Sequence, residues 1–228
     1  MRRLRPSPAA LRWRAQYPRR LVLDWLSGAS RRTANGVLAL TFDDGPHPGS
    51  TDRVLDVLAE LDVRATFFCV GKNAQAYPGL VRRMRAEGHA VGSHSMTHPH
   101  PAETPLDVLA MEYVQGQRAV AAAYGGDIVL FRPPHGHFDL ASAQLVRRLG
   151  LASWLWNVDT LDWRPGTTAA EVAALAGQAR AGGVVLMHDW VEQPLAPEAQ
   201  DRSATVQALP VIVAELRGRG LRLESLQS

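Results

Sequence analysis

Short apolar runs alternate with amphipathic stretches along most of this chain, and this alternation is what most restricts its fold. The apolar runs have the length of buried strands, and the amphipathic stretches have the periodicity of helices packed on one side. Strands are expected at 37–42, 65–70, 89–93, 128–132, 151–158, 184–188 and 221–226, with helices at 51–61, 78–88, 106–124, 139–149, 168–181 and 205–217. Such alternation predicts a parallel sheet covered by helices, either a barrel or an open doubly wound sheet.

The sequence divides into a basic arm, residues 1–36, and one domain, residues 37–228, and the total length of 228 residues suits a single core. Residues 1–32 contain nine arginines and one acidic residue, so the net charge of +3 conceals an acidic domain. We expect the arm to be a solvated lead-in that packs beneath the domain. Contact of the arm with an anionic membrane or cell-wall polymer is the alternative. An acidic body without interleaved basic and aromatic residues argues against nucleic-acid binding.

Neither a membrane span nor an export signal is visible in the sequence. No segment approaches the roughly 20 apolar residues that cross a bilayer, and the apolar run 21–23 stops at Asp24. The sequence alone therefore favours a cytoplasmic or membrane-peripheral location. Cys69 is the single cysteine and lies in an apolar run, which predicts a buried, inert thiol.

Reactive side chains collect where the expected strands end. They are Asp43, Asp44, His94, His98, Arg132, Asp159, Asp162, Trp163 and His188. In α/β barrels the active site is built at the carboxyl ends of the strands, from loops that follow several different strands. Charges scattered over a surface would have no reason to gather at one end, so this placement predicts a catalytic site there.

Two histidines and an acidic pair indicate a metal site. His94 and His98 are four residues apart, a spacing that puts both imidazoles on one face of a helical turn, and Asp43 or Asp44 can add one carboxylate. Catalytic zinc sites use three protein ligands and leave one position open. Non-haem iron uses the same kinds of ligand, so the residues alone leave the metal open.

The remaining groups suit the hydrolysis of an amide. A bound divalent ion lowers the pKa of its water to about 7 and polarises a carbonyl oxygen. Amide cleavage also needs a base for the water and an acid for the departing amine. One aspartate of the pair 43–44 can bind the metal while the other serves as the base, held ionised by an arginine. His188 can be the acid, supported by Asp162. A simple Asp-Gly turn would not need these neighbours.

Five motifs resemble, in order, those of the polysaccharide deacetylases, the NodB-homology domain of carbohydrate esterase family 4. They are Thr41-Phe42-Asp43-Asp44-Gly45-Pro46, His94-Ser95-Met96-Thr97-His98, Arg132-Pro133-Pro134, Asp159-Thr160-Leu161-Asp162-Trp163 and Leu186-Met187-His188. The resemblance runs from about residue 37 to residue 226. It implies a distorted, TIM-like (β/α) barrel of about seven parallel strands, within the α/β class.

The resemblance also implies a role for each motif residue. Asp43 is similar to the family's general base, Arg132 to the arginine that positions that base, His188 to the general acid and Asp162 to its partner. The implied metal ligands are Asp44, His94 and His98, and the metal is one divalent ion, most often zinc, with cobalt, manganese or nickel as substitutes. The implied substrate-binding residues are Trp163, Leu186, Pro134, His135 and Gly136.

The implied substrate is an N-acetylated glycan such as peptidoglycan or a chitin-like oligomer, which a monomer would deacetylate in the cell envelope. A deformylase or deacetylase of a smaller or lipid-linked amide is one alternative, and a non-catalytic glycan-binding barrel is another. The chain departs from the family at His135, where members often have tyrosine or another aromatic residue. Its backbone N–H can still help to hold an oxyanion. We expect the side chains of His135 and His137 to line the groove.

Overall fold

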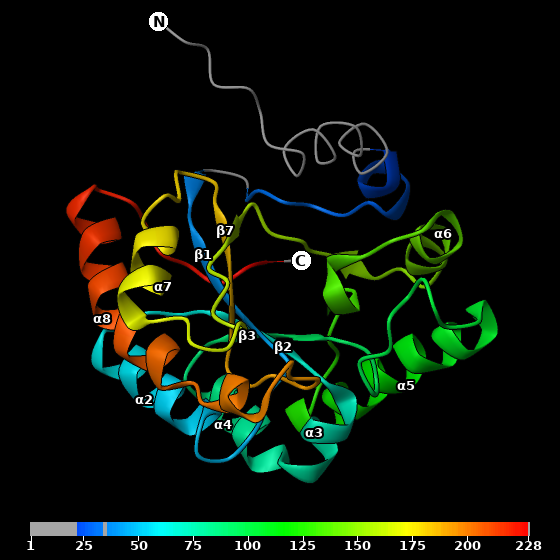
Figure 1. Cartoon of the computed structure of the whole chain (residues 1–228). Helices are drawn as coiled ribbons and strands as arrows, with labels where there is room; N and C mark the ends of the chain where they lie inside the picture. The colour runs from blue at the N-terminus through cyan, green and yellow to red at the C-terminus, as the bar shows by residue number, and fades with distance from the viewer. Residues whose placement is uncertain (1–21, 34–35, 228) are drawn as a thin grey trace, which may run out of the picture.

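A computed structural model describes residues 22–33 and 36–227, and one parallel sheet forms the centre of this part of the chain (Figure 1). The seven strands lie in the order β5-β4-β3-β2-β1-β7-β6, with β1 in the middle. Their bounds are β1 Ala39–Asp43, β2 Thr66–Cys69, β3 Ala90–Ser93, β4 Leu130–Phe131, β5 Ala152–Ser153, β6 Val158–Asp159 and β7 Val184–His188. The predicted α/β class with seven parallel strands is confirmed.

Helices cover the outside of the curled sheet (Figure 1). They are α2 Thr51–Glu60, α3 Gly71–Ala76, α4 Pro78–Ala86, α5 Leu106–Tyr124, α6 Leu140–Arg148, α7 Ala169–Ala176 and α8 Ser203–Gly218, with short 3₁₀ turns η2 Pro134–Gly136 and η3 Pro197–Gln200. Val54, Leu55 and Leu58 show how α2 packs, because these apolar residues at helical spacing are all fully buried. Against them lies a strand core in which the rings of Phe42 and Phe67 stack 5.1 Å apart.

Two of the expected strands were wrong. The run 151–158 forms the two short strands β5 and β6, because the chain between them turns away from β4 and the N–H of Leu155 bonds to the carbonyl of Ser30. The run 221–226 makes only an isolated bridge, between Leu38 and Leu223. An apolar run reports burial, and burial does not require pairing with a neighbouring strand.

The sheet is a half-barrel, because within the described residues its end strands β5 and β6 do not pair with each other. Residues 28–33 run along this open side. Ser30 forms a parallel bridge with Trp154, and the N–H of Thr33 bonds to the carbonyl of Gly182 at 3.1 Å. The last part of the predicted arm therefore contacts the domain, whereas residues 1–21 lie outside the described residues. The predicted boundary at residue 36 stays a prediction.

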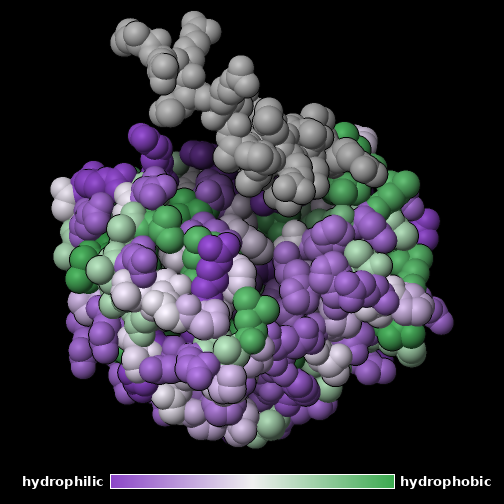
Figure 2. Space-filling view, in the orientation of Figure 1, coloured by the Kyte–Doolittle hydropathy of each residue, from purple (hydrophilic) through white to green (hydrophobic). Residues whose placement is uncertain are grey.

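The outer surface is mainly hydrophilic, with separate hydrophobic areas, in the view of Figure 2. Among the described residues, no helix combines the length and the apolar character that crossing a membrane requires. The predicted reactive residues lie at the carboxyl ends of the strands.

Candidate active site

The sheet brings the predicted reactive residues together at one end. Asp43 and His188 are the last residues of β1 and β7, and they are register partners in these neighbouring strands. Asp44 follows β1 directly, His94 follows β3, and Arg132 follows β4. Since all strands are parallel, their carboxyl ends meet at the same edge, as the sequence predicted.

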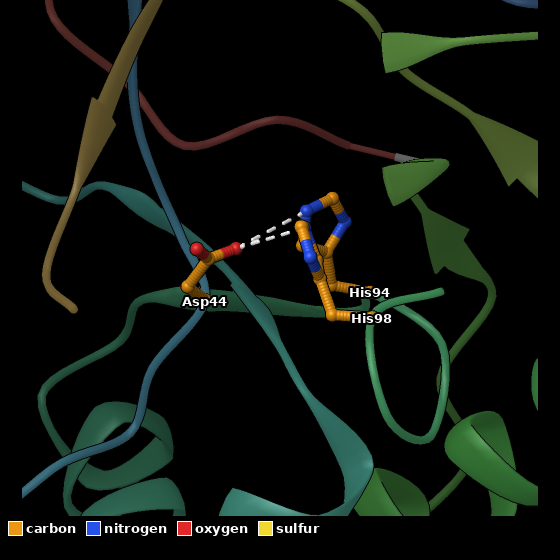
Figure 3. Close-up of side chains that lie close together, drawn as sticks. All are labelled: Asp44, His94 and His98. Carbon is orange, nitrogen blue, oxygen red and sulfur yellow. Dashed lines mark ion pairs between the residues drawn. The ribbon is translucent and has the colours of Figure 1, made fainter. Parts of the chain in front are cut away.

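Asp44, His94 and His98 form the candidate metal centre (Figure 3). One ligand atom from each residue lies within 4.8 Å of the others, and all three residues are buried. The Nε2 atoms of His94 and His98 lie 3.4 and 3.3 Å from Oδ1 of Asp44. The predicted helical turn was wrong, because residues 94–98 form a loop in which Ser95 and His98 have positive φ.

The atoms of this centre fit a cation. The Nδ1 atom of His94 lies 2.7 Å from the carbonyl oxygen of Arg132, which can only accept, so Nδ1 carries the proton and Nε2 keeps its lone pair. Burial lowers the pKa of His98 to about 4 and that of His94 well below its usual value, so both rings are neutral at pH 7. Oδ1 of Asp44 has no hydrogen-bond partner within the described structure. Electron pairs that converge in this way are stabilised by a positive ion.

Arg132 holds Asp43 in place. Its guanidinium is fully buried, and NH1 donates to Oδ1 of Asp43 at 2.7 Å and to the hydroxyl of Thr41 at 2.8 Å. The guanidinium also lies over the ring of Phe68, 4.2 Å from its centre. Burial raises the pKa of Asp43 to about 6, against the lowering effect of the charge on Arg132. Asp43 is therefore mainly a carboxylate at pH 7, with a basicity suited to accepting a proton.

His188 and Asp162 form the second ionised pair. Nδ1 of His188 donates to Oδ1 of Asp162 at 2.8 Å, and the N–H of His188 donates to the other carboxylate oxygen at 2.9 Å. Burial lowers the pKa of His188, because it disfavours the charged ring. The nearby carboxylates have the larger combined effect, of which Asp162 contributes most, and they raise this pKa to about 9. The imidazole is thus protonated at pH 7, and Nδ1 is tied to Asp162, so Nε2 is the atom from which it can donate a proton.

The predicted substrate-binding residues lie around this centre. Leu186 is buried in β7 beside Thr41, and Trp163 follows β6 and is half-buried.

Pro134, His135 and Gly136 form the turn η2, in which the centre of the His135 ring lies 4.6 Å from that of the His98 ring. A side chain at position 136 would meet the Trp156 ring at 2.2 Å, which explains the glycine there. The substrate-binding roles remain predictions.

Sequence reasoning missed several residues that hold the site together. The buried carboxylate of Asp189 accepts from the N–H of Gly45 at 3.2 Å and from the hydroxyl of Thr51 at 2.6 Å. Thr205 donates to Oδ2 of Asp162 at 2.8 Å, and Arg202 donates to the Asp162 carbonyl at 2.9 Å. The position of Asp189 directly after an expected strand was a usable signal. Thr205 and Arg202 lie about 40 residues from their partner, with no motif to link them.

Comparisons with known proteins agree with this architecture. The family model for polysaccharide deacetylases matches residues 30–154. A chitooligosaccharide deacetylase of Sinorhizobium fredii is 38% identical over 209 residues, which cover 90% of this chain and 97% of that protein. A peptidoglycan-N-acetylglucosamine deacetylase of Bacillus cereus is 34% identical over 82% of this chain and 84% of its own length. The family 4 carbohydrate esterase of Streptomyces lividans, solved with acetate, superposes with a TM-score of 0.74 at 35% identity, over 86% of this chain and 94% of that one.

The parallel half-barrel fold is thus shared with a carbohydrate esterase of family 4. The chain belongs to the polysaccharide deacetylase family, and the predicted resemblance and class of enzyme are confirmed.

Proposed function

We propose that this enzyme is a metal-dependent N-deacetylase that releases acetate from N-acetylglucosamine units of chitin-like oligomers or peptidoglycan. The single observation that carries the proposal is the convergence of two neutral imidazoles on a buried carboxylate oxygen without a hydrogen-bond partner, beside Asp43. The curated relatives that match most of the chain are named for chitooligosaccharide and for peptidoglycan substrates, which supports this class of glycan.

Asp44, His94 and His98 would hold the divalent ion, and zinc is the metal that we propose, since two histidines and one carboxylate are a common catalytic zinc set. Cobalt, manganese and nickel are the substitutes to test. When bound, a divalent ion supplies a lowered water pKa and polarises the amide carbonyl.

The residues around the ion supply the proton transfers. Asp43, oriented by Arg132, accepts a proton from the attacking water at a carboxylate oxygen. His188, protonated and aligned by Asp162, donates a proton from Nε2 to the departing amine. Asp43 and His188 are register partners in adjacent strands. The base and the acid would therefore lie on two sides of the bound amide. The backbone N–H of His135 would help to stabilise the oxyanion, and Leu186 would border the acetyl methyl group.

The test is acetate release from acetylated chitooligosaccharides and from peptidoglycan, with and without a chelator, by wild type and Asp43→Asn. Asparagine keeps the shape of Asp43 but cannot take up the proton, so kcat should fall about 100-fold or more while zinc binding persists. Asp56→Asn is the matched control, because Asp56 pairs with Arg83 on the surface of α2. Full activity in Asp43→Asn would refute the base assignment, and activity unaffected by chelation would refute the metal.

A further inference from the structure

Two of the candidate metal ligands have an unfavourable backbone conformation. Asp44 has φ 76° and His98 has φ 63°, which places both in the left-handed region that residues with a Cβ rarely occupy. Such a conformation persists only where surrounding contacts hold it. The carbonyl groups of these two residues show which contacts those are.

The Asp44 carbonyl is held by Asn73, from the first turn of α3. The side-chain amide of Asn73 donates to the carbonyl oxygen of Asp44 at 2.9 Å and to Oε2 of Glu192 at 2.8 Å. The N–H of Glu192 donates to Oδ2 of Asp44 at 2.9 Å, which leaves Oδ1 toward the histidines. An ion pair between Lys72 and Glu192 anchors this arrangement to α3.

The His98 carbonyl is held in the same way by the next residue of the loop after β7. The side-chain amide of Gln193 donates to the carbonyl oxygen of His98 at 3.0 Å. Both left-handed ligand residues therefore have a main-chain carbonyl that accepts a hydrogen bond from a side-chain amide, although the two amides come from different elements. Since Glu192 contacts Asp44 and Gln193 contacts His98, this loop also links the two ligand-bearing segments to each other.

We propose that Asn73 and Gln193 are positioning residues that set the affinity of the metal centre by holding Asp44 and His98 in their left-handed conformations. The inference rests on the proposed function, because it takes these two residues as metal ligands. Without the amide, the backbone relaxes toward right-handed φ and swings the carboxylate or imidazole away from the shared centre. The ion then binds more weakly although every ligand is still present.

The test compares Gln193→Met with Gln117→Met in the full chain. Methionine has the length of glutamine but no N–H, so each variant removes one hydrogen bond from an amide to a carbonyl. Gln117 is the matched control, because its side chain donates to the Ile128 carbonyl at 2.9 Å, away from the candidate metal centre. Zinc affinity of the metal-free protein is measured by competition with a chromophoric chelator, and thermal unfolding of the same samples reports on stability.

Gln193→Met should bind zinc about 10-fold more weakly or worse, as is usual when a contact behind a metal ligand is lost. Gln117→Met should bind zinc as wild type does, and the two metal-free variants should unfold at similar temperatures. Activity of Gln193→Met should recover as zinc is raised to saturation, which a damaged fold would not allow.

A second variant, Asn73→Leu, removes the other amide and should weaken zinc binding as well. Equal zinc affinity in Gln193→Met, Gln117→Met and wild type would overturn the positioning role and leave the proposed function standing. A wild-type protein that binds no divalent ion would overturn both. Because Gln193 lies on an exposed loop, its substitution leaves the core intact.

Discussion

At the scale of single residues, burial and charge set the two proton-transfer groups in opposite states. The pKa of Asp43 is raised to about 6 and that of His188 to about 9. Between these values the carboxyl is ionised and the imidazole is protonated, as a base and an acid that work in one cycle must be. Both groups depend on a buried partner of opposite charge, Arg132 or Asp162.

Asp162→Asn should shift the alkaline limb of the pH–rate profile. His188 can donate only while protonated, so activity is present below its pKa and is lost as the pH rises through about 9. The Asp162 carboxylate is the main group that raises this pKa, so its removal should move the loss to lower pH. The measurement is kcat/KM against pH for both proteins.

Thr205→Val is the matched control for that profile. It removes the hydrogen bond from Thr205 to Oδ2 of Asp162 but leaves the charge in place. Its alkaline limb should therefore stay close to that of wild type. An Asp162→Asn profile that coincides with wild type would show that His188 is not the acid.

At the scale of elements, the loop with the two histidines depends on the face of α5 beneath it. Glu112 accepts from the N–H of Met96 at 3.1 Å and from the N–H of Thr97 at 2.8 Å. Gly116 lies one helical turn further along α5, and a Cβ there would come within 2.3 Å of the Ser95 backbone. The loop can approach the helix this closely only because position 116 has no side chain.

Gly116→Ala is therefore predicted to displace the loop and weaken metal binding, at a cost of about 1–3 kcal/mol in the free energy of unfolding. Gly79→Ala in α4 is the matched control, because nothing lies within 4 Å of its added Cβ. Alanine there should leave stability unchanged or raise it by up to about 1 kcal/mol. Denaturant unfolding and zinc titration measure both effects. Equal behaviour of the two variants would contradict the close-packing argument.

Some features of the fold and of the candidate site can be predicted from the sequence, and others cannot. Strand ends were predictable because buried strands are continuous apolar runs, and the polar residue that ends a run marks the edge where side chains gather. The loop conformation at 94–98 was not, because His-x-x-x-His spacing is the same on a helix and on a loop. Asn73 and Gln193 could not be predicted, because their roles depend on partners that are distant in the sequence. Gln193, for example, contacts His98, which lies 95 residues earlier.

At the scale of the whole molecule, the half-barrel leaves the edges of β5 and β6 apart, and residues 28–33 run along this side. Just before this segment, Leu23 and Leu26 pack against a cluster of buried apolar residues that includes Ala143 and Val146 of α6. Arg31 makes the polar contacts. Its guanidinium bonds to both oxygens of Asp24, at 2.6 and 3.2 Å, and to the Trp156 carbonyl at 3.1 Å. One side chain thus ties the segment to the connection between β5 and β6.

Arg31→Met should consequently lower the stability of the whole domain, because it leaves the largely buried Asp24 carboxylate and the Trp156 carbonyl without this partner. Arg31 is itself one-third exposed, so solvent screening limits the expected loss to about 1 kcal/mol, or about 2–4 °C in Tm for a chain of this size. Arg32→Met is the matched control, since Arg32 makes an exposed hydrogen bond to the Ala181 carbonyl. Calorimetric unfolding measures the Tm of the two variants. If Arg31→Met melts no earlier than Arg32→Met, the contacts of Arg31 do not hold the open side of the half-barrel, which leaves the backbone hydrogen bonds of Ser30 and Thr33 and the apolar packing of Leu23 and Leu26 to hold it.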